Sequence, residues 1–577
     1  MKKKAIPVII VIILILLLGA VYAGNMVIEH FAYSKEKANL YEYYGMTQED
    51  EVPIIMGDEL LENRARMIDG NVYMSFADVQ ELINDRFYYS SEDDEVLYAM
   101  ADRIIWAAPG SSNAQSENGS EMDYGFEIVK KIGDELYLAI EFVREYSSMD
   151  YSLYTDPYRL QIYTKEATES TAGLKKDTAI RLRGGIKSPI LEELKAGDRV
   201  VILEELDDWA RVKSATSIIG YLEKKHLTDY QTENIAEPMP LSDTDYSSIS
   251  MDRKVILGWH MIAGMAGNDT FDSVVAGATS LNVISPTWFQ MSDNEGAIVS
   301  FAEDSYVAKA HDRGMKVWAA LDNFNNQEFL TSGSTGRVLA RRDSRTTLIN
   351  NIMSELNSHD IDGVNVDLEF VGDSAQQIIE DNGEDYIEFI RELSIACRKD
   401  YKVLSVDVPV PFGNSYYHRK ELGTVCDYLV IMGYDEHYDG SSEAGSVASI
   451  SYVENGILDT IEEVAPSKII NGMPTYTRIW FTTSDNQVTS QAGGMDWAEE
   501  YAASHGMEKV WDEENCQNYA EYEQNDGTKV QIWFEDKESL GARLGVMKVN
   551  DIAGAAIWKL GYENASFWEE MASYAGG

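Results

Sequence analysis

Cysteine is scarce in this 577-residue chain, which contains only Cys397, Cys426 and Cys516. The three residues form no Cys-x-x-Cys pair and no Cys/His ligand spacing, so we expect neither a zinc site nor a disulfide framework. We interpret them as small buried apolar residues, with a single bridge such as Cys426–Cys516 as the alternative.

Positive charge is also scarce. The chain has 48 Lys and Arg residues against 97 Asp and Glu residues, which gives a formal net charge of -49. Such a surface repels phosphate backbones, so we expect no nucleic acid partner. It also argues against docking on anionic lipid through a basic patch. The acidity is typical of a soluble, exported protein.

The apolar content is sufficient for folding. Hydrophobic residues make up 45% of the chain and charged residues 25%, a globular composition that can bury sizeable cores. Because 577 residues exceed the size of one ordinary core, we expect several domains.

A long uncharged apolar run occurs at the N-terminus, from Ala5 to Ala23, directly after Lys2, Lys3 and Lys4. This pattern predicts that residues 1–24 form a transmembrane helix, with the lysines on the cytoplasmic side and the rest of the chain exported. The alternative is a cleaved signal peptide and a secreted protein.

A degenerate repeat occupies residues 50–170. Gly70–Val79 resembles Asp134–Val143, and each copy begins as an alternating strand that runs into a short helix. A further strand is expected after each copy, at Glu95–Tyr98 and at Arg159–Tyr163. The segment therefore predicts a small repeated α+β domain.

Pro109–Ser120, between the two copies, is rich in Gly, Ser and Asn and predicts a loop. The whole pattern resembles the N-terminal domain of copper amine oxidases as it recurs in bacterial cell-surface proteins. No histidine cluster accompanies it, so the resemblance implies a spacer or a wall-binding module without copper.

Residues 176–229 contain short alternating strands separated by Gly and Asp turns. The strands lie in these segments: Ala179–Leu182, Leu194–Leu203, Trp209–Val212 and Gly220–Leu222. Their order resembles a bacterial Src-homology-3-like barrel. That resemblance implies either cell-wall peptide binding or packing against a neighbour.

A polar linker is expected at residues 230–252, and beyond it the pattern changes. Short apolar strands alternate with helical stretches such as Thr346–Asn357 and Tyr386–Arg398, which predicts an α/β TIM barrel over residues 253–572. An insertion at about 480–540 is expected to hold a small sheet. The eight predicted strands are Lys254–Trp259, Leu281–Pro286, Lys316–Leu321, Ile361–Glu369, Lys402–Pro409, Asp427–Met432, Lys468–Met473 and Gly554–Trp558.

The fourth predicted strand carries an alternating polar stripe. Its apolar side chains point outward to the helices: Val364, Val366 and Leu368. Its polar side chains then point into the barrel: Asn365, Asp367 and Glu369. Burying such a stripe for structure alone is costly, and the catalytic groups of TIM barrels sit at the C-terminal mouth. The stripe therefore indicates an active site.

Asp362–Glu369 resembles the signature D-G-x-D-x-D-x-E of glycoside hydrolase family 18, the chitinase and endo-N-acetylglucosaminidase family. Ile431–Asp435 is similar to its M-x-Y-D motif and Gly472–Trp480 to its G-x-P-x-Y-G-R-x-W motif. Ala556–Gly561 resembles its eighth-strand segment. The insertion with Trp533–Asp536 resembles the branch of bacterial spore-cortex and cell-wall glucosaminidases.

The resemblance implies substrate-assisted catalysis with retained configuration, in which the 2-acetamido oxygen of the sugar attacks the anomeric carbon. Glu369 is then the general acid, Asp367 orients the acetamido N–H, and Tyr434 donates a hydrogen bond to the acetamido oxygen. Asp362 and Met432 belong to the same motifs and are expected to support these groups. Neither a metal nor an organic cofactor is implied.

One residue departs from the family signature. Asn365 stands where the family has its middle aspartate, and an amide cannot share a proton as a carboxyl group does. We expect catalysis to survive with an altered pH optimum, because Asn365 can still orient Asp367.

Aromatic and polar side chains at the predicted strand ends are candidates for sugar binding. Trp558 is the strongest candidate for a stacking platform. Trp259 and Trp480 are as compatible with core packing as with sugar stacking. Arg478 and Asp435 either bind sugar hydroxyls or form an internal ion pair. Tyr476 completes the set of predicted substrate-binding residues.

Two hypotheses follow. The first is a cell-surface hydrolase of a glycan that contains N-acetylglucosamine, either peptidoglycan or a chitin-like polymer. The second is a non-catalytic glycan-binding protein on a degenerate barrel. The joint presence of Glu369, Asp367 and Tyr434 favours the hydrolase, because a lectin needs no proton donor.

Overall fold

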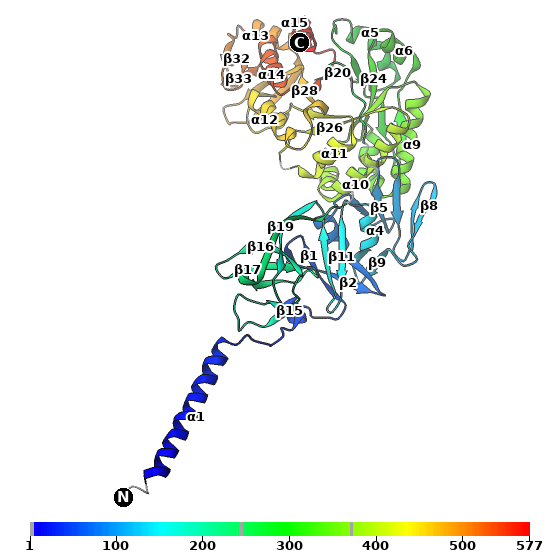
Figure 1. Ribbon diagram of the computed structural model, residues 1–577. Helices are drawn as coiled ribbons and strands as arrows, with labels where there is room; N and C mark the ends of the chain where they lie inside the picture. Colours follow the sequence, from blue (N-terminus) through cyan, green and yellow to red (C-terminus); the bar gives the residue numbers. More distant parts are fainter. Residues whose placement is uncertain (1–4, 239–240, 242–245, 370–372, 413, 577) are drawn as a thin grey trace. The chain divides into compact units, whose positions relative to one another are not determined.

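The computed structural model describes residues 5–238, 241, 246–369, 373–412 and 414–576 (Figure 1). Contacts divide the chain into two compact units. The first comprises Met1–Phe87, Ala107–Ala114 and Met122–Ser242, and the second comprises Tyr88–Trp106, Gln115–Glu121 and Asp243–Gly577. The predicted domain boundaries, of which residues 239–240 and 242–245 lie outside the described residues, stay predictions.

The first unit begins with helix α1 (Ala5–Phe31), which covers the predicted membrane segment. Over the described part of the chain, however, no helix combines the length and the apolarity that a membrane crossing requires. The predicted transmembrane anchor is therefore not supported.

The repeated segment has the expected order of a strand that runs into a helix. β3 (Asn71–Ser75) leads into α3 (Phe76–Leu82), and β10 (Glu135–Ala139) leads into α4 (Ile140–Glu145). The two strands are antiparallel neighbours in a sheet of order β11-β12-β1-β2-β3-β10-β9. The remaining strands are β1 (Glu51–Met56), β2 (Glu59–Ile68), β9 (Val129–Ile132), β11 (Asp150–Tyr154) and β12 (Arg159–Tyr163).

The predicted loop at Pro109–Ser120 is wrong in part. β7 (Asn113–Ser116) and β8 (Gly119–Asp123) are neighbouring strands of a sheet. The turn between them is formed by Glu117 and Asn118, and Gly119, the first residue of β8, has a φ of 114°, a conformation that glycine adopts without strain. The small and polar residues here therefore mark the turn of a hairpin, and the strands extend into them.

The predicted Src-homology-3-like segment is a set of short strands. They belong to a sheet of order β15-β14-β18-β17-β16-β13-β19 over a buried core that includes Ile180, Ala210 and Leu222. Their bounds are β13 (Ala167–Leu174), β14 (Thr178–Arg181), β15 (Ile190–Leu194), β16 (Arg199–Glu205), β17 (Trp209–Ser214), β18 (Ile219–Glu223) and β19 (Leu227–Ala236). β19 extends into the predicted linker. The resemblance to that barrel family stays a prediction.

The second unit contains the predicted TIM barrel. Over the described residues, eight parallel strands form a ring, which closes because β21 pairs with both β20 and β24. The strands are β20 (Val255–His260), β21 (Val283–Pro286), β24 (Lys316–Asp322), β25 (Gly363–Asp367), β26 (Val403–Pro409), β27 (Tyr428–Met432), β28 (Ile469–Pro474) and β34 (Gly554–Trp558). Each of the eight predicted strands is confirmed.

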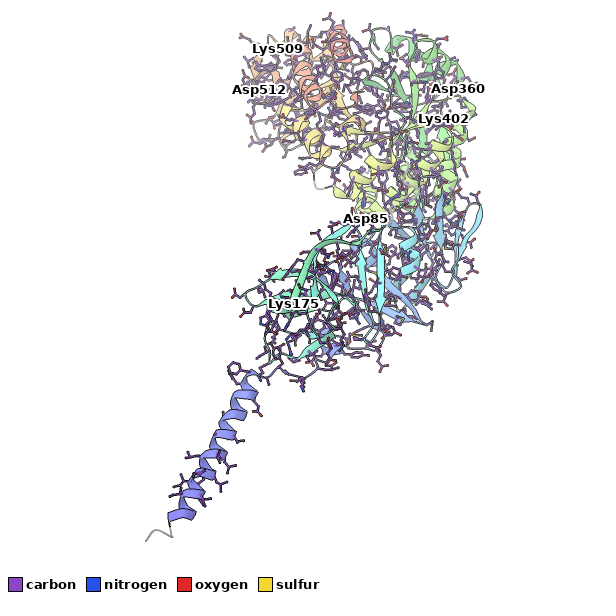
Figure 2. The ribbon with its side chains drawn as sticks, viewed as in Figure 1. Asp85, Lys175, Asp360, Lys402, Lys509 and Asp512 are labelled. Carbon is purple, nitrogen blue, oxygen red and sulfur yellow. The ribbon has the colours of Figure 1, made fainter. Side chains whose placement is uncertain are left out.

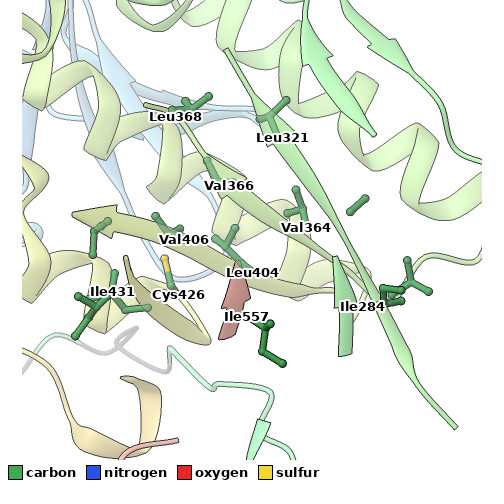
Figure 3. Packing of buried hydrophobic residues seen from close by; sticks show 14 of the residues in the cluster. Ile284, Leu321, Val364, Val366, Leu368, Leu404, Val406, Cys426, Ile431 and Ile557 are labelled. Carbon is green, nitrogen blue, oxygen red and sulfur yellow. The ribbon is translucent and has the colours of Figure 1, made fainter. Parts of the chain in front are cut away.

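The barrel has one apolar layer outside the strands and one inside. Val364, Val366 and Leu368 belong to the outer cluster, which also contains side chains of the helices. Figure 3 shows these three residues together with other members of that cluster. Trp318 and Tyr428 belong to the inner cluster and stack at 5.3 Å. The helices include α6 (Asp304–Asp312), α9 (Arg342–Ser358), α10 (Asp373–Lys399), α11 (Arg419–Val425), α12 (Ile450–Ile461), α14 (Lys537–Val549) and α15 (Ala565–Ala575).

The insertion between β28 and β34 holds a sheet, as predicted. Its strand order is β30-β29-β33-β32-β31, and α13 (Met495–Ser504) packs on it. The strands are β29 (Tyr476–Thr482), β30 (Val488–Gly494), β31 (Val510–Asp512), β32 (Gln517–Glu523) and β33 (Lys529–Trp533). Asp512, labelled in Figure 2, accepts a hydrogen bond of 3.1 Å from the Trp533 indole.

A further sheet of the second unit packs against α10. It has the order β4-β5-β6-β7-β8 and includes β4 (Phe87–Ser90), β5 (Glu95–Ala99) and β6 (Ile104–Ala107). Its apolar side chains share a core cluster with Ile395 of α10, and the Tyr88 hydroxyl donates to Asp385 at 2.5 Å. Part of the predicted N-terminal domain therefore packs on the barrel helices.

Candidate active site

Carboxylates lie at both ends of strand β25. Asp362 immediately precedes the strand, at the N-terminal end of the barrel, whereas Asp367 ends it and Glu369 follows at the C-terminal end. Asp362 accepts hydrogen bonds from the Val317 amide at 2.9 Å, from Lys316 at 2.7 Å and from His311 at 2.8 Å. It therefore fixes the base of the barrel and lies at the end away from Glu369.

Strand register brings three aspartates to one level inside the barrel. Asp322 on β24 is the Cα partner of Asp367 on β25, and Val366 is the partner of Val406 on β26. The next residue along β26 is Asp407, which therefore lies level with Asp367. Adjacent strands are about 4.8 Å apart, so the three carboxyl groups are close neighbours.

Asn365 lies one layer below these aspartates and is fully buried. Its Oδ1 accepts from the Trp259 indole at 2.8 Å and from the Ser285 hydroxyl at 3.2 Å. Its Nδ2 donates to the Ser405 hydroxyl at 2.8 Å and to Asp407 Oδ1 at 2.7 Å. All four hydrogen-bonding positions of the amide are thus occupied, and none contacts Asp367.

This network gives Asn365 a role other than the one expected. Asn365 and Asp367 are both described, and no hydrogen bond joins them, so the amide does not orient Asp367 directly. Its direct carboxylate partner is Asp407.

Glu369 is largely buried and has an altered acidity. Burial is the main cause, and the charges of Asp435 and Asp322 add to it, so that the pKa of Glu369 rises to about 7. A carboxyl group with this pKa carries a proton for part of the time at neutral pH, which a general acid requires.

Asp367 and Asp407 are also shifted. Burial, followed by the charges of Glu369, Asp407 and Asp322, raises the pKa of Asp367 well above its ordinary value. Burial and the charge of Glu369 likewise raise the pKa of Asp407, against the lowering effect of its bond from Asn365. Carboxylates this close cannot all ionise, so the cluster retains protons at neutral pH.

Tyr434 follows β27 and lies beside these carboxyl groups. Burial, then the charges of Asp367, Asp407 and Glu369, raises the pKa of its phenol, which keeps the hydroxyl available as a donor. A Cβ added at Gly472 would lie 2.9 Å from the Tyr434 ring, so only glycine leaves room for the ring there. The Tyr434 ring also meets that of Tyr476 edge-on at 6.5 Å.

The comparisons decide the family. The sequence model of the glycosyl hydrolases family 18 matches residues 267–563, just over half of the chain and most of the barrel. The chain belongs to glycosyl hydrolase family 18. It is therefore a glycosidase, and the fold prediction of a TIM barrel agrees with that family.

Similar proteins share this barrel region. The "Uncharacterized glycosylase YvbX" of Bacillus subtilis (strain 168) is 24% identical over 326 residues, which cover 54% of this chain and 90% of that protein. The "Cortical fragment-lytic enzyme" of Bacillus anthracis is 21% identical over 282 residues, which cover 48% of this chain and 64% of that protein, slightly less than two thirds. The structure of the C-terminal domain of a putative chitinase from Desulfitobacterium hafniense DCB-2 aligns with a TM-score of 0.49 at 22% identity, covering 56% of this chain and 99% of that one.

Within this family 18 barrel, the predicted sugar-binding residues lie in two groups. Tyr476 donates a hydrogen bond to Asp435, and Arg478 Nη2 lies 3.9 Å from the same carboxylate. These three residues form one cluster beside Tyr434. Asp435 is about half exposed on its side chain, which leaves it free to accept from a hydroxyl as well.

The tryptophans differ in exposure. Trp558 is half-buried at the end of β34 and meets the Trp259 ring edge-on at 5.9 Å. Trp259 is 2% exposed and Trp480 is 1% exposed, with its indole donating to Gly445 O at 2.8 Å. The structure thus places Trp259 and Trp480 in the interior and gives Trp558 alone of these three a partly open ring. Met432, at the end of β27, is half-buried.

Sequence reasoning missed two carboxylates of the family 18 site, Asp322 and Asp407. Asp407 continues the inward polar side of β26 in the alternation Leu404-Ser405-Val406-Asp407-Val408, whereas Asp322 is the last residue of the otherwise apolar inward side of β24. That alternation was a usable signal. Whether either aspartate lies beside Asp367 depends on the register between strands, which cannot be read from the sequence.

Proposed function

We propose that the chain is a retaining glycosidase that cleaves β-linked N-acetylglucosamine glycans, with Glu369 as general acid. The observation that carries the proposal is the raised pKa of Glu369, about 7, beside Asp367 at the C-terminal end of a family 18 barrel. A largely buried carboxyl group held among other carboxylates is well suited to proton donation and poorly suited to ordinary structural pairing.

The proposed reaction has two steps. In the first, Glu369 gives its proton to the glycosidic oxygen while the acetamido oxygen of the sugar attacks the anomeric carbon, so the bond to the leaving group breaks. In the second, the Glu369 carboxylate removes a proton from water, and the water oxygen attacks the same carbon and opens the oxazolinium ring. Two inversions at one carbon give net retention.

Asp367 and Tyr434 have complementary roles in this scheme. The Asp367 carboxyl accepts from the acetamido N–H and balances the positive charge of the oxazolinium ring. The Tyr434 hydroxyl donates to the acetamido oxygen, and the shape of the β28 backbone at Gly472 keeps that ring in place. Trp558, Asp435, Tyr476 and Arg478 form the proposed sugar contacts.

The substrate class follows from this chemistry, because a sugar without a 2-acetamido group has no internal nucleophile. Peptidoglycan and chitin-like polymers both supply one. The name of the Bacillus anthracis relative, a cortical fragment-lytic enzyme, supports cell-wall glycan as the first substrate to test. A location outside the cell stays a prediction.

The proposal is tested with the full chain and its Glu369→Gln variant on purified peptidoglycan and on N-acetylglucosamine oligomers. We expect the variant to lose about 10²–10⁴-fold in the release of reducing ends, because general acid catalysis contributes that much. Sedimentation with the insoluble glycan should show that binding is retained. Glu523→Gln, an exposed glutamate on β32, is the matched control and should match the wild type.

A second substrate separates the reaction types. Oligomers in which the acetamido groups have been removed should not be cleaved, since they lack the attacking oxygen. Equal turnover by the wild type and Glu369→Gln would show that the acid lies elsewhere. Binding by the wild type with no turnover of either glycan would favour the non-catalytic alternative.

A further inference from the structure

The site lacks a carboxyl group at one position where the family signature has one, and a carboxyl group of the neighbouring strand contacts that position. Residue 365 is an asparagine in place of the middle aspartate of the motif, whereas Asp407, on the neighbouring strand, supplies a carboxylate in direct contact with that asparagine. A hydrogen bond of 2.7 Å from Asn365 Nδ2 to Asp407 Oδ1 joins the two side chains.

The orientation of the Asn365 amide follows from its partners. The Trp259 indole nitrogen can only donate, so the amide oxygen must face Trp259 and the amide nitrogen must face β26. Asp407 Oδ1 is therefore an acceptor in this bond and can be either ionised or neutral. Because Trp259 and Ser285 hold the other side of the amide, Asn365 fixes the position of the Asp407 carboxyl group.

The second oxygen of Asp407 remains available. Asp407 is 2% exposed, and within the described residues its Oδ2 has no hydrogen-bond partner. The same holds for Oδ1 of Asp367. Asp367 and Asp407 lie at one level on adjacent strands and the charge of Asp407 acts on Asp367, so the two carboxyl groups that carry these oxygens are neighbours.

Among the described residues, no positive charge acts on Asp367 or Asp407 to hold both groups as anions. The described titratable groups that interact with Asp407 come from three other elements and are all acids: Asp367 and Glu369 of the β25 segment, Tyr434 after β27, and Tyr386 of α10. Burying two adjacent carboxylates without a cation is costly, and one shared proton removes most of that cost.

We propose that Asp407 positions Asp367 and shares one proton with it. Asp407 thereby takes over the function of the carboxyl group that residue 365 lacks. This inference rests on the proposed function of Glu369 and Asp367. The pair holds one proton and one negative charge throughout. When the oxazolinium charge develops, the proton resides on Asp407 and Asp367 is the anion that faces the acetamido group; no proton is consumed.

A purely structural role for Asp407 makes a different prediction. If the carboxylate only satisfied the Asn365 N–H, a neutral amide oxygen would serve equally well. Asp407→Asn keeps the shape of the side chain and can present its oxygen to Asn365, so the bond and the fold should both persist. The amide group of this variant cannot take up a proton.

The experiment compares Asp407→Asn with the exchange variant Asn365→Asp/Asp407→Asn, in which the carboxyl group returns to β25. We expect Asp407→Asn to lose about 10²-fold in kcat with KM changed less than threefold, and to alter the pH profile, since a buried neighbouring charge is removed. The exchange variant should recover kcat to within tenfold of the wild type, because a carboxyl group then occupies the middle-aspartate position of the signature, two residues before Asp367 on the same face of β25.

The matched control is Asp427→Asn. Asp427 is also a buried barrel carboxylate, but it accepts from the Leu404 and Ile249 amides at the start of β27, away from Glu369. It should lose thermal stability and keep the kcat and pH profile of the wild type.

Two outcomes would overturn the inference. One is Asp407→Asn with the kcat and the pH profile of the wild type. The other is a folded exchange variant whose kcat stays about 10²-fold below that of the wild type, and this outcome decides the matter alone if Asp407→Asn does not fold. Neither outcome touches the proposed function, because that stands or falls with Glu369→Gln.

Discussion

Asp362 and Asp367 lie at opposite ends of β25 and have opposite electrostatic surroundings. Asp362 accepts from Lys316, His311 and a backbone amide, and these contacts lower its pKa against the effect of burial. Asp367 lies among Glu369, Asp407 and Asp322, and burial with these charges raises its pKa well above the ordinary value.

A contrast in hydrogen-bond partners also holds between neighbouring strands. At the N-terminal end of the barrel, Lys254 and Asp551 pair at 2.7 Å, and Asp427 accepts from two backbone amides. At the C-terminal end, the carboxylates of β24, β25 and β26 are level with one another, and for Asp367 and Asp407 no cation is among the interacting groups. At the N-terminal end these carboxylates accept hydrogen bonds from cations or backbone amides, whereas at the C-terminal end Asp367 and Asp407 are buried beside other acids, which raises their pKa values.

The largest expected effect comes from making the same substitution at both ends. Asp367→Asn should lower kcat by about 10²–10³-fold, because an amide cannot balance the oxazolinium charge, while the melting temperature stays equal or rises as repulsion is relieved. Asp362→Asn should lose about 1–3 kcal/mol of stability through its hydrogen bonds to Lys316 and His311, with kcat per folded molecule unchanged.

Steady-state kinetics and thermal unfolding of the two variants check this contrast. A lower kcat per folded molecule in Asp362→Asn would show that the two ends of the strand are coupled. Unchanged kcat in Asp367→Asn would remove Asp367 from the proposed mechanism.

Much of the barrel could be predicted because its signals are local. Parallel strands buried on both faces appear as short apolar runs, and the alternation in Asn365-Val366-Asp367-Leu368 fixes which side chains face inward. The placing of Val364 and Val366 in the outer cluster, and of Asn365 against Trp259 inside, follows that alternation.

What could not be predicted depends on register between strands. Asp407 is inward-facing by the same alternation, but only the pairing of Val366 with Val406 places it beside Asp367 and in reach of Asn365. The hairpin of β7 and β8 was missed for a related reason, since a glycine-rich turn and a glycine-rich loop have the same composition until the strands on either side are paired.

A smaller effect is expected from the charge next to Glu369. Asp435 is the carboxylate that contributes most to its raised pKa after burial, so Asp435→Asn should lower that pKa from about 7. Glu369 must be protonated to act, and activity is lost as pH rises through its pKa. The basic limb of kcat/KM should therefore move to lower pH, by about one unit or less.

The pH dependence of kcat/KM from pH 4 to 10 checks this shift. Asp439→Asn, an exposed aspartate in the same loop, is the control and should leave the limb in place. A basic limb that moves to higher pH, or one that is identical in both variants, would mean that another group sets it.

The smallest expected effect is on stability and has a definite sign. The folded pKa of Glu369, about 7, exceeds the ordinary value of 4.5, so the protonated side chain is tolerated at low pH and its ionisation costs stability as pH rises through 7. Glu369→Gln carries no such cost. The variant should therefore match the wild type at pH 4 and exceed it by about 1–3 kcal/mol at pH 9, as urea unfolding at the two pH values would show. Because the same substitution removes activity, a gain in stability only at high pH would show that the carboxyl group is held in place for its proton, and a loss at both pH values would show instead that its contacts support the fold.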